Sequence, residues 1–130
     1  MASKPRILVV DDEPAVLLTY TLILEQNGYA VEAMQSVDEA KTALNDKHFD
    51  LVVCDLSLRT NSAHRGQGGL EVIEYARKRQ PKVGVVLLTG FADKETTEEA
   101  ARRGVALLFK PIDVQELLNT LRLLAGGSAA

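Results

Sequence analysis

The sequence predicts an α/β fold in which one parallel sheet carries helices on both faces. Short apolar runs alternate with helix-like segments five times along the 130-residue chain. Several of these runs are apolar at consecutive positions, as in strands that are covered on both faces. Helix start and stop signals separate the runs, and right-handed crossovers between parallel strands then require helices on both sides of the sheet.

The predicted strands are 7–10, 29–34, 51–54, 83–88 and 105–109. The predicted helices are 14–27, 36–46, 69–79, 93–103 and 113–124. In the first half of the chain, Pro14 suits the first turn of a helix and Gly28 favours the end of that helix. Ser36 and Glu39 have the spacing of a capping box, which predicts the start of the second helix.

Similar signals bound the elements of the second half. A polar loop from Ser57 to Gly68 follows the third strand. Pro81 closes the third helix, and Gly104 ends the fourth. Asp113 caps the fifth helix, with Glu116 three residues on. One apolar stripe of that helix consists of Leu117, Leu118, Leu121 and Leu124.

Composition excludes several classes of protein. Apolar residues make up 46% and charged residues 25%, which is typical of a globular domain. The net charge of −3 gives no electrostatic reason to expect nucleic-acid binding. The densest basic cluster, 77–79, ends a predicted helix and suits its dipole. No apolar run approaches the length of a membrane span, and no signal-peptide core follows the N-terminus, so we expect a cytoplasmic protein. Cys54 is the sole cysteine, so no internal disulfide forms.

Polar side chains follow four of the predicted strands. Asp11 and Asp12 follow the first strand, Asp55 the third, Thr89 the fourth and Lys110 the fifth. In open parallel sheets, sites form outside the carboxyl ends of the strands. We therefore expect three carboxylates, a hydroxyl and an ammonium group to meet at one edge of the sheet.

Such a carboxylate cluster is suited to a hard divalent cation, because clustered carboxylates repel one another when ionised. Mg²⁺ prefers oxygen ligands and takes one or two carboxylates together with phosphate oxygens. Asp12 and Asp55 are the natural direct ligands, Asp11 binds directly or through water, and the backbone carbonyl of Ser57 is a further ligand. One carboxylate of such a site can also be the nucleophile toward a phosphoryl group.

Each of these residues also has a purely structural interpretation. Asp11 and Asp12, just before Pro14, could cap a helix. Asp55 and Thr89 could form turns. The joint pattern over four strand ends favours the phosphoryl-transfer interpretation.

At this point the sequence resembles the receiver domain of two-component response regulators, the CheY-like family. The matching motifs are 8–14, 53–56, 88–90 and 109–111. The resemblance implies a flavodoxin-like (βα)5 sandwich with a five-stranded parallel sheet in the order 2-1-3-4-5. It also implies one receiver domain over residues 1–130, with its core at about 5–125 and a flexible tail or linker stump at 126–130.

The resemblance implies a role for each residue at the strand ends. Asp55 accepts a phosphoryl group from a sensor histidine kinase or phosphotransfer protein, Lys110 binds the phosphoryl oxygens, and Thr89 moves to bond the new phosphate. The implied magnesium ligands are Asp11, Asp12, Asp55 and Ser57. The domain catalyses only its own phosphorylation and dephosphorylation, and so controls a partner or an attached output. The Lys110–Pro111 bond is expected to be cis. The resemblance is also compatible with a homodimer.

Three departures from the family pattern bear on the switch. The loop from Arg59 to Gly68 is about six residues longer than is usual, and Gly69 takes the place of the family's loop glycine. The position that often holds a switch aromatic is Leu107, and Phe109 is a poor substitute because alternation points it away from Lys110. Phe91 puts a large apolar group where attacking water would pass, which predicts a long-lived phosphoryl state.

Two alternative functions share parts of this residue pattern. An aspartyl-phosphate phosphatase of the haloacid-dehalogenase type needs a second aspartate two positions after the nucleophile, where this chain has Ser57. A flavin or nucleotide carrier needs a glycine- or hydroxyl-rich phosphate loop after the first strand, where the carboxylates of Asp11 and Asp12 repel phosphate.

The first helix presents a candidate docking surface. Its predicted core face consists of Val16, Tyr20, Ile23 and Leu24. Leu18 and Leu22 are four residues apart and lie off that face. Because the family docks its kinase on this helix near the active site, these two leucines are the predicted docking residues. Exposed leucines without a partner are the alternative.

Overall fold

The computed structural model describes residues 4–58, 68–90 and 93–126, which form one five-stranded parallel sheet in the order β2-β1-β3-β4-β5. The strands are β1 Arg6–Val10, β2 Ala30–Met34, β3 Leu51–Asp55, β4 Gly84–Thr89 and β5 Ala106–Phe109. The helices are α1 Pro14–Gln26, α2 Val37–Asp46, α3 Gly68–Arg79, α4 Lys94–Arg102 and α5 Val114–Leu124. The predicted fold class and strand order are confirmed, and every predicted element lies within one residue of its observed ends.

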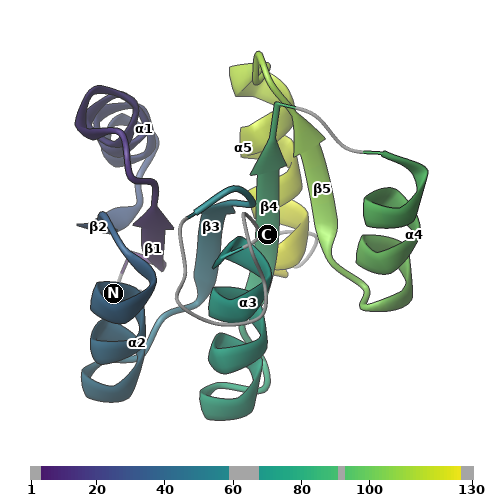
Figure 1. Cartoon of the computed structure of the whole chain (residues 1–130). Helices are drawn as coiled ribbons and strands as arrows, with labels where there is room; N and C mark the ends of the chain where they lie inside the picture. The colour runs from purple at the N-terminus through teal and green to yellow at the C-terminus, as the bar shows by residue number, and fades with distance from the viewer. Residues whose placement is uncertain (1–3, 59–67, 91–92, 127–130) are drawn as a thin grey trace.

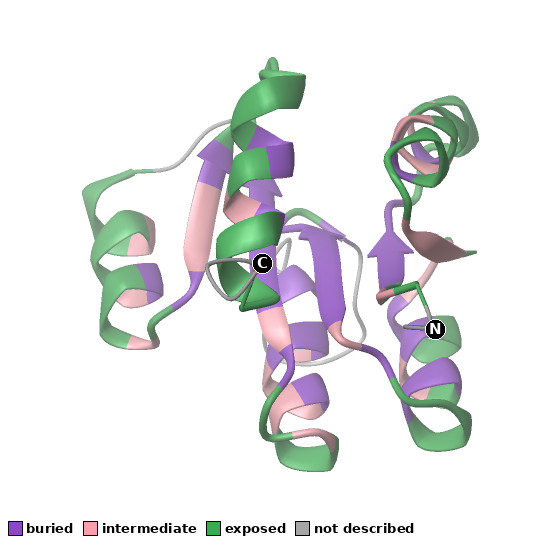
Figure 2. Cartoon of the chain, turned by 180° about the vertical axis from the view of Figure 1, so that it is seen from behind, coloured by how far each residue is buried: buried purple, intermediate pink, exposed green. Residues whose placement is uncertain are grey.

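The sheet separates two apolar layers, with α1 and α5 on one face and α2, α3 and α4 on the other (Figure 1). Successive side chains along each strand point to opposite faces of the sheet and so contribute to both layers. Leu8 and Val52 join the layer beneath α2 and α3. Val9 and Val53 join the layer beneath α1 and α5. Strand β3 is buried at every position, as Figure 2 shows, so its carboxyl end is held firmly.

The helix caps follow the local chemistry expected from the sequence. The Ser36 hydroxyl accepts a hydrogen bond from the Glu39 amide at 3.1 Å, and the Glu39 carboxylate accepts one from the Gln35 amide. The Asp113 carboxylate accepts a bond from the Glu116 amide at 3.0 Å. Gly28 has a φ of 95°, a conformation that glycine adopts without strain.

Two helix faces differ in detail from the predicted ones. Leu17 and Leu24 are the buried residues of α1, whereas Val16, Tyr20 and Ile23 are only half-buried. On α5 the predicted stripe is buried except at Leu124, the last residue of the helix, which is 38% exposed. The strand ends lie within one residue of where they were predicted despite these two differences. Within the described ranges, no helix is long and apolar enough to cross a membrane.

Candidate functional site

Three carboxylates meet where β1 and β3 end. In the parallel register Val10 pairs with Cys54, so the chain turns out of the two strands side by side at Asp11 and Asp55. Asp11, Asp12 and Asp55 each place a carboxylate oxygen within 4.8 Å of the others. The predicted clustering of these three residues is confirmed.

Asp55 is buried, with 5% of its surface exposed, and its carboxylate is held from two sides. The Ser57 backbone amide donates to Oδ1 at 3.3 Å, and the Ser57 hydroxyl lies 3.2 and 3.3 Å from Oδ1 and Oδ2. The Lys110 ammonium lies 3.6 Å from Oδ1. These contacts orient the carboxylate while leaving it at the surface of a hollow that contains Lys110.

Asp11 is the most buried member of the cluster, with 2% of its surface exposed. Burial raises the pKa of its carboxyl, and the neighbouring charge of Asp55 adds to that effect. The Glu13 amide, which donates to Oδ1 at 2.9 Å, and the Lys110 ammonium, at 4.0 Å from Oδ2, both oppose the rise in pKa. A bound divalent cation would favour the ionised form of the whole cluster, and a set of hard oxygen donors suits Mg²⁺.

Thr89 and Lys110 come from the ends of β4 and β5. Thr89 is 3% exposed, and its backbone carbonyl accepts a bond from the Lys110 amide at 2.7 Å. The Lys110–Pro111 bond is cis, as the resemblance implied. The Lys110 ammonium lies near Asp11 and Asp55, and the strand ends bring all five predicted polar residues to one edge of the sheet.

A hollow of about 650 Å³ opens beside this cluster. Its lining residues are Asp12, Glu13, Gln35, Ser36, Asp55, Ser57, Leu58 and Lys110. Gln35 was missed at the sequence level, although a signal was available. Strand β2 is the neighbour of β1, so the residues that follow β2 border the same edge.

Gly69 is the close contact between α3 and the end of β3. A Cβ atom at this position would lie 2.5 Å from the Asp55 carbonyl oxygen and 2.7 Å from the Leu56 Cα. The Gly69 amide donates to the Leu56 carbonyl at 3.0 Å. Glycine therefore lets the first turn of α3 support the backbone of Asp55 directly.

The departures from the family pattern lie in different parts of the molecule. Residues 59–67 of the long loop and Phe91 lie outside the described residues. Leu107 is half-buried and packs on the layer that contains α2 and α3. Phe109 is 51% exposed.

Cys54 points away from the carboxylates into the core, as alternation predicts, and is fully buried. Burial raises the pKa of its thiol well above the usual range, and Asp55 adds to the effect. We expect Cys54 to react with a disulfide reagent roughly a hundredfold more slowly in the native protein than in urea. Absorbance of the released thiolate measures the rate, and equal rates would show that this part of the core opens readily.

Comparisons with known proteins agree with this geometry. A family model described as the response regulator receiver domain matches residues 7–122. The chain is 36% identical over 116 residues to the alginate biosynthesis transcriptional regulatory protein AlgB of Pseudomonas putida. That match covers 88% of this chain and 25% of AlgB, so the chain spans about a quarter of the length of this relative.

Two solved structures have the same fold over nearly the whole chain. A CheY-like receiver domain protein from Methanospirillum hungatei is 29% identical, with a TM-score of 0.84 and 96% of both chains covered. A response regulator from Burkholderia pseudomallei, with a phosphorylated aspartic acid, calcium ion and citrate, is 30% identical, with a TM-score of 0.79. That match covers 96% of this chain and 71% of the Burkholderia protein.

Proposed function

The chain belongs to the response regulator receiver domain family, and we propose that Asp55 is its phosphoacceptor and that Mg²⁺ assists the transfer. The observation that carries the proposal is the meeting of Asp11, Asp12 and Asp55 within 4.8 Å, with the Lys110 ammonium 3.6 Å from Asp55. The phosphorylated aspartic acid and calcium ion of the Burkholderia protein support both parts of it.

In the proposed step, a carboxylate oxygen of Asp55 attacks the phosphorus of a phosphohistidine. A P–O bond forms as the P–N bond breaks, and the electron pair stays on the imidazole nitrogen, which takes a proton from water. Lys110 stabilises the charge on the phosphoryl oxygens, and the Ser57 amide orients the attacking carboxylate. Asp11, Asp12, Asp55 and the Ser57 carbonyl would hold Mg²⁺, which would neutralise part of the phosphoryl charge.

Thr89 is proposed as the residue that reports the phosphoryl group to the rest of the domain. It is buried at the end of β4, and its backbone carbonyl accepts a hydrogen bond from the Lys110 amide. A movement of either residue therefore displaces the other. Leu107 on β5 packs on the layer that contains α2 and α3, so at this position an aliphatic side chain stands where the family often has an aromatic one.

The proposed phosphoryl donor is a histidine kinase or phosphotransfer protein, and residues 5–125 are proposed as one receiver unit. The aspartate-nucleophile phosphatase is disfavoured because Ser57, which lacks an ionisable proton in the working range, stands where an acid is needed. We infer that the only chemistry of the domain is its own phosphorylation and dephosphorylation.

Intact mass after incubation with acetyl phosphate tests the proposed function. With Mg²⁺, we expect one labile phosphoryl group per chain, because the cation relieves repulsion between the carboxylates and the phosphoryl group. With EDTA in place of Mg²⁺, we expect the adduct to fall at least about tenfold. A folded protein that gains no phosphoryl group from acetyl phosphate or from a phosphohistidine protein would contradict the proposal.

Leu18 and Leu22 are proposed to dock the phosphohistidine protein. They are 59% and 50% exposed and lie one turn apart on α1, which begins two residues after Asp12. Replacing both by alanine is expected to slow phosphotransfer from a phosphohistidine protein about tenfold, because apolar contact area at an interface is lost. The rate with acetyl phosphate, which needs no docking surface, should not change.

Leu123→Ala is the matched control for the docking pair, because Leu123 is 72% exposed on α5. It should leave both rates at the wild-type level. If the double variant received phosphate from the phosphohistidine protein as fast as the wild type, these leucines would be ordinary surface residues.

A further inference from the structure

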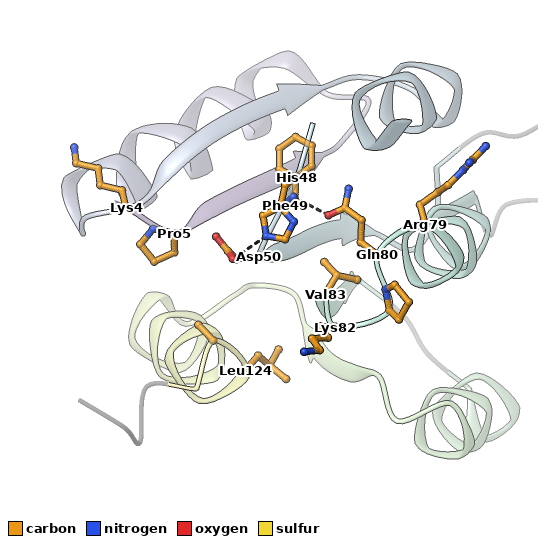
Figure 3. Close-up of a pocket in the computed structure, with 12 residues that line it drawn as sticks. Lys4, Pro5, His48, Phe49, Asp50, Arg79, Gln80, Lys82, Val83 and Leu124 are labelled. Atoms are coloured by element: carbon orange, nitrogen blue, oxygen red, sulfur yellow. Dashed lines mark hydrogen bonds and ion pairs between the residues drawn. The ribbon is translucent and has the colours of Figure 1, made fainter. Parts of the chain in front are cut away.

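A second pocket lies at the opposite edge of the sheet from the carboxylate cluster. It has a volume of about 710 Å³ and lies between the start of β1, the loops that precede β3 and β4, and the end of α5 (Figure 3). Its volume is within the range of small-molecule sites. None of its lining residues belongs to the hollow beside Asp55.

The pocket has apolar walls. Pro5 precedes β1, Pro81 and Val83 belong to the segment between α3 and β4, and Leu124 is the last residue of α5. Two proline rings and two branched aliphatic side chains offer smooth surfaces but few hydrogen-bonding groups. Such walls suit a ligand with a flat apolar body.

Cationic residues also belong to the lining, and Figure 3 shows the side chains of Lys4 and Arg79 directed outward from these walls. Lys4, Arg79 and Lys82 line the pocket, and Asp50 is its one acidic lining residue. The Asp50 carboxylate already has two partners. It accepts a hydrogen bond from the Arg6 backbone amide at 2.8 Å, and it lies 3.2 Å from Nε2 of His48. Within the described part of the chain, neither Lys4 nor Lys82 forms an ion pair, so this rim carries surplus positive charge on a chain of net charge −3.

The floor of the pocket is held in place by one side-chain amide. The Gln80 side-chain oxygen accepts a hydrogen bond from the Phe49 backbone amide at 2.7 Å. Its side-chain nitrogen donates to the backbone carbonyls of Leu44 and Lys47 at 3.1 and 2.8 Å. Figure 3 shows Gln80 directed at Phe49, which is fully buried below. These bonds tie the segment before β4 to the segment before β3, so the pocket is formed before any ligand arrives.

We propose that this pocket binds a small organic anion with a flat apolar body, whose acidic group pairs with Lys82. The combination of apolar walls with an unpaired cationic rim favours such a molecule over an inorganic anion, which would leave the walls wet, and over a neutral hydrocarbon, which would leave the cations unused. A ligand seated there contacts Leu124 and Ala125, where α5 ends.

Anilinonaphthalene sulfonate is a suitable probe because it joins a flat aromatic body to one anionic group. Titrated into the ¹⁵N-labelled full chain, it is expected to shift the amide signals of His48, Lys82, Val83 and Ala125 while the other signals stay in place. Lys82→Glu is expected to raise the dissociation constant of the probe about fivefold, since a partly exposed ion pair contributes up to about 1 kcal/mol. Lys78→Glu, an equal charge change on an exposed residue outside the pocket lining, should leave it unchanged.

Two further ligands and two variants separate the outcomes. Inorganic phosphate and the neutral phenylnaphthylamine should each bind at least fivefold more weakly than the sulfonate. Equal binding of the neutral compound, or signals that shift elsewhere, would overturn the proposal. Binding that appears only after removal of residues 127–130 would assign the pocket to the chain's own C-terminal segment and would also overturn it. Asp55→Asn should bind the probe like the wild type, so this test is independent of the proposed phosphoryl transfer.

Discussion

Replacing Asp55 with asparagine is expected to abolish the Mg²⁺-dependent phosphoryl adduct. Asparagine keeps the shape of the side chain and can still accept the bond from the Ser57 amide, which lies 3.3 Å from Oδ1 in the wild type. It lacks the carboxylate nucleophile, and a neutral amide does not attack phosphorus under these conditions. Intact mass after incubation with acetyl phosphate and Mg²⁺ checks the result.

Stability measurements separate loss of chemistry from loss of structure. Asp55 is buried beside two other carboxylates, so removal of its charge relieves repulsion, and we expect Asp55→Asn to unfold in urea at the wild-type concentration or above it. Asp46→Asn, an equal change on an exposed residue at the end of α2, should phosphorylate normally. A full adduct on folded Asp55→Asn would place the acceptor at another carboxylate of the cluster.

The strand-end rule explains why so much of this cluster could be predicted. In a parallel sheet, every strand delivers its next residue to the same edge, so sequence position alone places Asp11, Asp55, Thr89 and Lys110 together. Gln35 follows the same rule at the end of β2, so its position was the available signal, although the amide side chain itself does not point to phosphoryl transfer.

The faces of the helices were harder to predict. On α1, a rotation of one position moves the buried face from Val16 to Leu17, because both residues are apolar and periodicity alone leaves the phase open. The role of Arg77 was only partly predicted. It lies in the last turn of α3 as expected, but its guanidinium donates to the carbonyls of Arg103 and Gly104, which follow α4. That contact joins residues 26 and 27 positions apart, which local pattern cannot reveal.

Gly69→Ala is expected to destabilise the protein, although it adds only one methyl group. Alanine favours helix over glycine by up to about 1 kcal/mol, which would stabilise α3. The added Cβ, however, meets the backbone of Asp55 at 2.5 Å and that of Leu56 at 2.7 Å, and backbone atoms cannot rotate out of the way. Overpacking of this kind costs about 1–3 kcal/mol. Because the contact is with rigid atoms on both sides, we expect the clash to exceed the gain and the free energy of unfolding to fall.

Urea denaturation of Gly69→Ala and Gly90→Ala separates this clash from a general effect of adding a methyl group. A Cβ at Gly90 meets no described atom within 4 Å, and Gly90 directly follows Thr89, so Gly90→Ala should stay within about 0.5 kcal/mol of the wild type. The folded fraction of Gly69→Ala should also accept phosphate more slowly from acetyl phosphate, because the displaced backbone carries Asp55. If Gly69→Ala matched the wild type in both stability and phosphorylation rate, α3 would be free to shift without moving Asp55. The support that α3 gives to the acceptor would then be dispensable.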